Sequence, residues 1–89
     1  MNIEVWFFGP LRTLSTRTQV VILDTGARFS DLCDRLSQSY GVVFDQEIQK
    51  KDDYFIMING SYCNRTADVG QRILIDGDIV AFLPLIAGG

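Results

Sequence analysis

The segment at residues 84–89, Pro-Leu-Ile-Ala-Gly-Gly, holds the group best suited to chemistry, a carboxylate that follows two glycines. It comes directly after residues 79–83, a run typical of a buried strand. Glycine has no Cβ, so Gly88 and Gly89 let the backbone pass through a channel too narrow for side chains. Residues 85–89 span about 17 Å when extended. We therefore expect a flexible tail that delivers its carboxylate into another protein.

A carboxylate of this kind needs activation before it can react, because the ionised group is a poor electrophile. Joining it to a nucleotide phosphate supplies a good leaving group. The chain has no glycine-rich phosphate loop and is expected to bind no cofactor itself, so ATP would be used by an activating partner. A frayed end is the plainer alternative. Frayed ends are usually polar, whereas this one carries Pro84, Leu85, Ile86 and Ala87, which we expect to contact a partner.

Other candidate groups are few. The sequence contains no histidine, which removes the commonest general base and most zinc sites. Cys33 and Cys63 lack metal or redox spacing and are expected to be buried thiols. Asp76 and Asp78 flank a glycine, and we expect a turn with solvated acids rather than a cation site. We predict no metal site and no independent enzyme.

Composition indicates one folded domain, with 47 % hydrophobic and 21 % charged residues. The net charge of −3 argues against nucleic acid as a partner, since phosphate-backbone binders concentrate basic residues. There is no run of about 20 apolar residues and no basic leader before a cleavage site. We expect a cytoplasmic protein with no membrane contact.

The first half of the chain predicts two strands and a helix. Residues 2–8 and 19–24 are rich in β-branched and aromatic types, which favours a hairpin with a loose loop. Residues 30–40 have apolar residues at helical spacing, with Ser30 as the N-cap and Gly41 at the C-terminal end.

The second half of the chain is predicted to form three strands. Residues 41–53 have no clean period and are interpreted as a surface connection with at most a short turn. Residues 54–58 form a strand, Asn59-Gly60 is a strong hairpin signal, and residues 61–63 are the return strand. The last strand follows at 79–83.

The order strand-strand-helix-strand-strand-strand predicts an α+β fold of the β-grasp, ubiquitin-like type. A mixed sheet of about five strands would carry one main helix across one face, with the final strand beside the first. We assign residues 1–84 to this domain and residues 85–89 to the tail.

Alternation along the strands predicts an open apolar face. If Ile3, Val5 and Phe7 face the helix, Trp6 and Phe8 point to the other side. The same alternation in the last strand buries Val80 and Phe82 and exposes Ala81 and Leu83. Large aromatic residues on an open sheet face indicate a protein interface, although a loop covering Trp6 is an alternative.

Several stretches together resemble a known family. VWFFGPLR near the start, ING in the middle and LIDGDIVAFLPLIAGG at the end are similar to the small subunit of molybdopterin synthase and its ubiquitin-fold sulfur-carrier relatives of the ThiS and MoaD type. The similarity spans essentially the whole chain.

The resemblance implies a sulfur-transfer cycle with three partners. An enzyme related to the ubiquitin-activating, E1-like enzymes would adenylate Gly89 with ATP, and a sulfur donor protein would convert it to a thiocarboxylate. The tail would then enter the large subunit of molybdopterin synthase, in a heterotetramer. There it would donate sulfur to cyclic pyranopterin monophosphate during molybdenum or tungsten cofactor biosynthesis. This chain would be the non-catalytic, sulfur-donating subunit.

The resemblance also implies that the outer sheet face docks the partners, with Phe8 and Leu83 first, then Trp6 and Arg12. One alternative keeps the sulfur carrier but serves cysteine, thiamin or tRNA thiolation, or couples the glycine to protein lysines as a modifier. Another is a β-grasp interaction module that acts without covalent chemistry.

Overall fold

The fold comes from a computed structural model and is described for residues 1–8, 18–49, 54–63 and 67–84. In chain order the elements are β1 (Asn2–Phe7), β2 (Thr18–Ile22), α1 (Phe29–Tyr40), α2 (Val42–Gln49), β3 (Tyr54–Ile58), β4 (Ser61–Cys63), α3 (Ala67–Gly70) and β5 (Ile79–Pro84).

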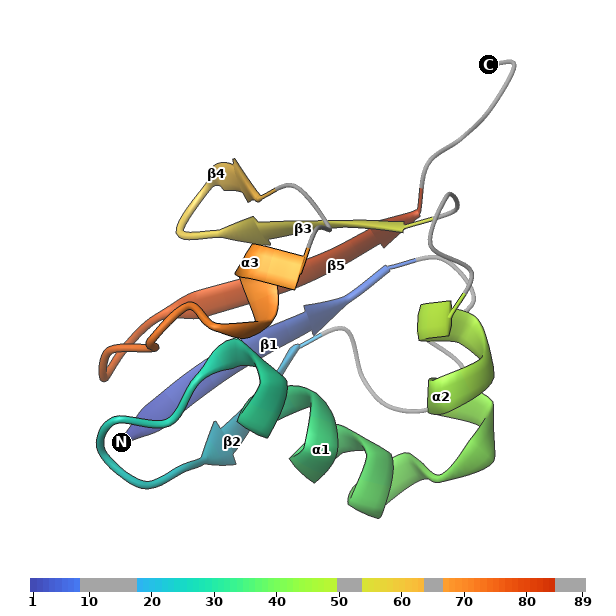
Figure 1. The fold of residues 1–89 in the computed structure, drawn as a ribbon, viewed down its shortest axis with the longest axis horizontal. Coiled ribbons are helices and arrows are strands. Elements are labelled where there is room, and N and C mark those ends of the chain that lie inside the picture. The colour runs from blue at the N-terminus through green and yellow to red at the C-terminus, as the bar shows by residue number, and fades with distance from the viewer. Residues whose placement is uncertain (9–17, 50–53, 64–66, 85–89) are drawn as a thin grey trace.

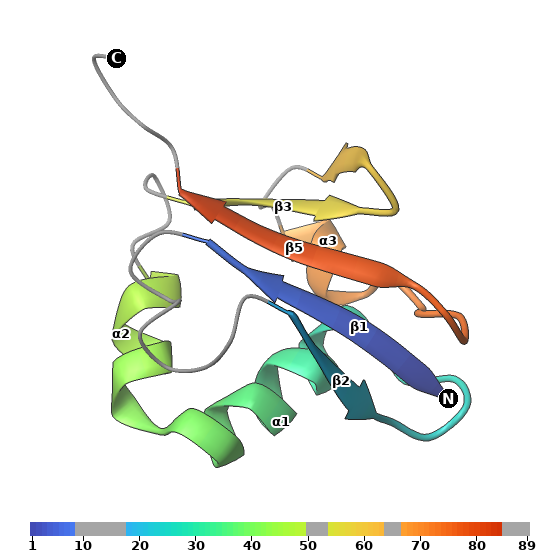
Figure 2. The same cartoon turned by 180° about the vertical axis from the view of Figure 1, so that it is seen from behind.

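The five strands form one mixed sheet in the order β2-β1-β5-β3-β4 (Figures 1 and 2). β5 runs parallel to β1 and antiparallel to β3, while β1–β2 and β3–β4 are antiparallel hairpins. The prediction that the final strand lies beside the first is confirmed. The strand that leads into the tail is therefore at the centre of the sheet.

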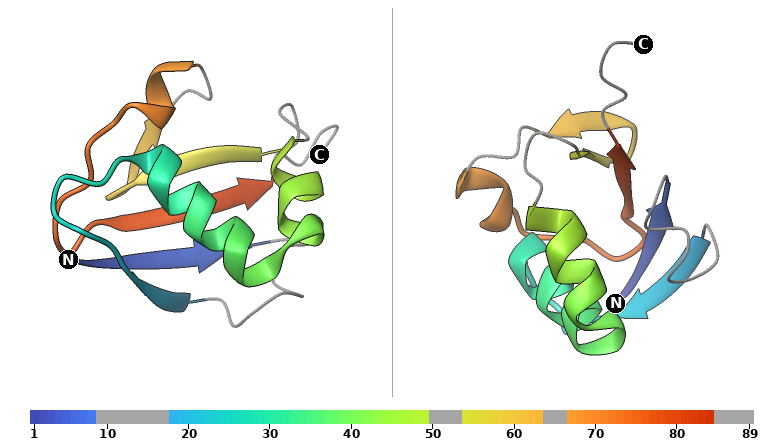
Figure 3. Two further views of the ribbon diagram at one scale, coloured as in Figure 1. Left: turned by 60° about the horizontal axis from the view of Figure 1, so that its bottom comes forward. Right: turned by 90° about the vertical axis from the view of Figure 1, so that its right-hand side faces the viewer.

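All three helices lie on one side of the sheet, which we call the inner face (Figure 3). The core forms between them and the alternate residues of the strands. Phe82 of β5 is at its centre, with ring centroids 5.8 Å from Phe7, 6.0 Å from Phe29 and 6.0 Å from Phe44. Burial of aromatic rings at these separations adds specific contact energy to the hydrophobic term. β5 is thus anchored by its inner side chains.

Helix α1 begins one residue earlier than predicted, because Phe29 is buried within its first turn. The predicted N-cap, Ser30, was wrong; the N-cap is Arg28. The Arg28 backbone N–H donates to the Asp31 carboxylate at 2.8 Å, which satisfies a donor that the helix start leaves open. The end at Gly41 is confirmed, where φ is 71°, a value that glycine adopts without strain.

Helix α2 (Val42–Gln49) replaces much of the connection predicted at residues 41–53. The Ser37 hydroxyl of α1 donates to the Asp45 carboxylate at 3.0 Å, which joins the two helices. Phe44 is buried against the aromatic cluster, whereas Val42 and Val43 are exposed. The prediction failed because exposed valines beside a single buried anchor hide the helical period.

A polar clasp made by Asp78 and Asn59 joins the start of β5 to the β3–β4 turn. The Asp78 carboxylate accepts the Asn59 side-chain N–H and the Ile75 backbone N–H, both at 2.8 Å. The Asn59 side-chain oxygen accepts the Ile79 backbone N–H at 2.9 Å. Asp78 is only 8 % exposed, so the prediction of two solvated acids was wrong for this residue. The hairpin turn itself is confirmed, with positive φ at Asn59 and Gly60.

We predict that Asp78→Ala lowers the free energy of unfolding by about 2 to 3 kcal/mol, because two donors lose a charged acceptor in a buried position. Urea unfolding measures this loss. Asp76→Ala is the matched control, since Asp76 is exposed and accepts one N–H, that of Asn2 at 2.7 Å. Its cost should be less than about 1 kcal/mol. Equal losses in the two variants would show that the Asp78–Asn59 clasp stabilises the fold no more than a single exposed hydrogen bond does.

Candidate partner-docking face

The face of the sheet opposite the helices, called the outer face, has no helix over it in the part of the chain that the structure describes (Figure 2). The strand alternation was predicted correctly. Ile3, Val5 and Phe7 are fully buried on the inner face, whereas Trp6 and Phe8 are half-buried on the outer one. In β5, Val80 and Phe82 are buried while Ala81 and Leu83 remain partly exposed.

A shallow apolar hollow of about 310 Å³ lies over β5 on the outer face. It is lined by Trp6, Phe8, Met57, Gly60, Ile79, Ala81 and Leu83.

Ala81 forms the floor of this hollow because of its place in the register. It lies opposite Trp6 of β1 on one side and Met57 of β3 on the other. A methyl group between two long side chains leaves space above the sheet. The hollow therefore follows from one small residue in the central strand.

The polar content of the outer face near the hollow is low. Glu4 is half-buried beside Trp6, and its carboxylate accepts the indole N–H of that residue. The Trp6 and Phe8 rings are 6.1 Å apart, which keeps them as one aromatic wall. A hydrophobic patch with a polar margin is typical of a surface that binds another protein.

The hollow leads towards the candidate tail. β5 passes beneath it from Ile79 to Leu83 and ends at Pro84, which lies opposite Tyr54. A protein bound in the hollow would therefore contact the strand that leads to residue 85.

Of the predicted site residues, the structure brings Trp6, Phe8 and Leu83 together around the hollow. Arg12 and the tail residues Leu85, Ile86, Ala87, Gly88 and Gly89 lie outside the described residues, as does the side chain of Pro84. Their roles, and the division between domain and tail, stay predictions.

Sequence reasoning missed Met57, Gly60 and Ile79 as lining residues. The signal was present in the alternation of β3 and β5, but the hollow needs the pairing of Ala81 with Met57, which pattern alone does not specify. Cys33 and Cys63 were predicted to be buried; both are half-buried.

Within the described ranges, no group of histidine, cysteine, aspartate and glutamate side chains is arranged to hold a metal ion. Among the helices described, none has the length and apolar character needed to cross a bilayer.

The topology and the open outer face define the class of protein. A mixed five-stranded sheet with parallel β1 and β5, crossed by α1 on its inner face, is the ubiquitin-like β-grasp fold. The family follows from the sequence. Residues 5–89 match the model of the ThiS family, and the chain belongs to that family. The resemblance to ubiquitin-fold sulfur carriers is therefore confirmed.

Solved structures of the same fold cover nearly the whole chain. Small archaeal modifier protein 1 from Methanosarcina acetivorans is 24 % identical, with a TM-score of 0.76 over 99 % of this chain and 96 % of that one. The complex of subunits 1 and 2 of molybdopterin-converting factor from Helicobacter pylori 26695 contains a chain that is 25 % identical, with a TM-score of 0.65 and full coverage of both.

A third similar structure is the BexX/CysO complex of Amycolatopsis orientalis, at 17 % identity and a TM-score of 0.71, covering 98 % of this chain and 99 % of that chain. Two of these three structures are thus complexes with a second protein. No curated protein sequence matches this chain.

We predict that Ala81→Leu fills the hollow without harm to the fold. The free energy of unfolding should change by less than about 0.5 kcal/mol, because the added atoms lie on the outer face. Trp6, the single tryptophan, should emit at shorter wavelength as the leucine shields it, and binding of an apolar fluorescent dye should weaken. Val43→Leu, on the exposed side of α2, is the control and should leave dye binding unchanged. Equal dye binding by both variants would place the apolar site elsewhere.

Proposed function

We propose that this chain is a sulfur carrier that bears a thiocarboxylate on Gly89 and donates its sulfur as the small subunit of molybdopterin synthase. The observation that carries the proposal is the apolar hollow, over which no described helix lies, along β5, the strand that leads directly into Leu-Ile-Ala-Gly-Gly. The family match through residue 89 and the likeness to a chain of the molybdopterin-converting factor complex support it.

The role of the folded domain is to position the tail relative to a partner. A partner that packs against Trp6, Phe8 and Leu83 holds the end of β5 at a defined position. From there, five residues reach about 17 Å when extended, which is enough to bring Gly89 into a partner's active site. Two glycines allow that site to be narrow, because they add no side chain to the channel.

The chemistry takes place on the carboxylate of Gly89 and uses groups of the partners. An E1-like activating enzyme binds ATP; the carboxylate attacks the α-phosphorus, and pyrophosphate leaves. A sulfide equivalent from a sulfur donor protein then displaces AMP, so a C–S bond replaces one C–O bond. The large subunit of molybdopterin synthase, in a heterotetramer, would bind the tail and transfer the sulfur to its pterin substrate.

Incubation with the cognate activating enzyme, ATP and a sulfur source is expected to raise the intact mass by one oxygen-to-sulfur exchange. Fragmentation should locate the change at Gly89, because its carboxylate is the group that the proposal has the partner activate. Omission of ATP is the control for activation. An unchanged mass with a demonstrably active partner would refute the carrier role.

The acceptor is tested with the same thiocarboxylated protein. The large subunit of molybdopterin synthase with cyclic pyranopterin monophosphate should return the mass to its starting value and yield a sulfur-containing pterin. Sulfur transfer only with a cysteine-forming, thiamin-forming or tRNA-thiolating partner, or adducts on lysines, would instead assign one of those pathways.

One alanine added after Gly89 is expected to abolish thiocarboxylate formation and leave stability unchanged. The extension displaces the carboxylate from the position where it meets the nucleotide, whereas the buried core ends in β5. Intact mass and urea unfolding measure the two properties separately. Ala81→Leu, with its tail intact, should slow the reaction by weakening docking and be rescued by more partner, whereas the extended variant should not be rescued. Full activity of the extended chain would contradict the proposal.

A further inference from the structure

One edge of the sheet is formed by β2. β2 has the sequence Thr-Gln-Val-Val-Ile over residues 18–22, with no charged residue and no proline, and it forms one margin of the sheet (Figure 2). The opposite margin, β4, has only three residues. Native proteins usually protect a long apolar edge with charges, proline or a covering segment, because its backbone groups can pair with another strand.

The register shows which backbone groups of β2 turn outward. Leu23 donates its N–H to the Met1 carbonyl at 3.0 Å, so Leu23 faces β1. In an antiparallel pair this direction alternates, which turns the backbone groups of Val20 and Ile22 away from β1. Arg35 of α1 confirms the direction, since its guanidinium donates to the outward carbonyl of Ile22 at 3.1 Å. No described residue pairs with the Val20 N–H and C=O or with the Ile22 N–H, so these groups can pair with a further strand.

Two side chains on this edge, Val20 and Ile22, are apolar and exposed. Val20 is 60 % and Ile22 is 66 % exposed, and both lie on the outer face of the sheet. A strand added at this edge would place alternate side chains beside Val20 and Ile22 on the same face. These contacts would remove apolar surface from water, which is favourable in proportion to the area buried.

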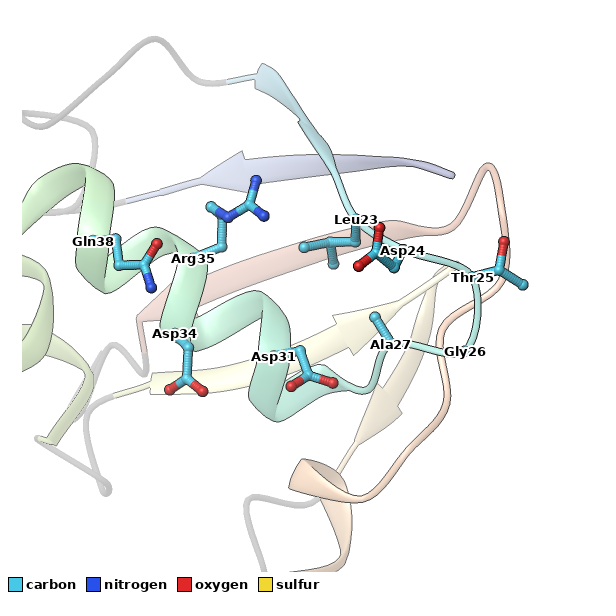
Figure 4. A pocket seen from close by; sticks show the side chains of 9 residues that line it. All are labelled: Leu23, Asp24, Thr25, Gly26, Ala27, Asp31, Asp34, Arg35 and Gln38. Carbon is cyan, nitrogen blue, oxygen red and sulfur yellow. The ribbon is translucent and has the colours of Figure 1, made fainter.

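A pocket of about 480 Å³ lies beside the end of β2, between the loop that follows it and helix α1 (Figure 4). Its charged lining residues are Asp24, Asp31, Asp34 and Arg35. Three carboxylates and one guanidinium leave the pocket negative, and that guanidinium is already held by the Ile22 carbonyl. A positive side chain is the complement of this lining.

We propose that the β2 edge binds an extended peptide segment of a partner protein as a sixth strand. The segment would have two aliphatic side chains at alternate positions, over Val20 and Ile22, and a lysine or arginine next to the second of them. Alternation turns that basic side chain to the inner side of the sheet, where the pocket beside Leu23 and Asp24 lies. Main-chain hydrogen bonds supply affinity in this mode, and the side-chain contacts supply specificity.

This surface is separate from the hollow over β5. β1 lies between β2 and β5, so a peptide on the β2 edge leaves the hollow open for a docking partner. It also does not use Gly89. The inference therefore stands or falls independently of the sulfur-carrier proposal.

The test uses the full chain, labelled with ¹⁵N, and a short synthetic peptide blocked at both ends. The peptide alternates valine with threonine and carries one lysine beside its last valine. Saturable binding should slow amide hydrogen exchange at Val20 and Ile22, which gain hydrogen-bond partners. Exchange at Val21 should stay unchanged, because that residue is already paired with Ile3 of β1.

Matched variants assign the binding to this edge. Ile22→Lys should weaken binding about tenfold or more, since it repels the basic peptide and removes the apolar contact. Val42→Lys is the control, because Val42 is also 66 % exposed but lies on α2. A peptide with glutamate in place of lysine should bind about tenfold more weakly to the unmodified chain, because the pocket lining is negative. Equal binding of the two peptides would overturn the role given to the pocket.

Three kinds of result would overturn the proposal. One is no saturable binding, or exchange changes confined to Trp6 and Phe8, which would assign the peptide to the hollow. Another is equal weakening by Ile22→Lys and Val42→Lys. The third is protection of Val20 and Ile22 that grows with protein concentration in the absence of peptide, because the occupant would then be a second copy of this chain.

Discussion

The parallel pairing of β5 with β1 is the constraint on which the rest of the structure depends. It places the last strand between β1 and β3, so that its backbone is hydrogen-bonded on both sides. Its inner side chains, Val80 and Phe82, are fully buried, and Phe82 contacts three other aromatic rings. The segment that follows β5 in the sequence is therefore attached to the central strand of the sheet.

The same strand also creates the docking surface, through its other face. Ala81 is too small to fill the space between Trp6 and Met57, and the hollow is the result. Further along the strand, the Asp78 clasp ties the start of β5 to the turn at Asn59. One strand thus joins the core to the outer face and leads towards residue 85.

Much of this was predictable because the strands alternate cleanly. Ile3, Val5 and Phe7 against Trp6 and Phe8 were assigned correctly to two faces, and Asn59-Gly60 identified the hairpin. Helix α2 was not predictable, because Phe44 is its buried anchor while its neighbours Val42 and Val43 are exposed. The role of Asp78 was missed for a different reason. Its hydrogen-bond partner Asn59 is 19 residues away in the sequence, so no local pattern indicates the contact.

The sequence by itself determined the local features: which residues form strands, which side of each strand is apolar, where a turn needs positive φ, and that two glycines follow the last strand. These depend on periods of two or a few residues and on the chemistry of single side chains. Only the tertiary structure decided which small residue lies between which large ones, and which strand is left at the edge beside an acidic pocket. Both depend on strand order and register, which arise from contacts between residues far apart in the chain.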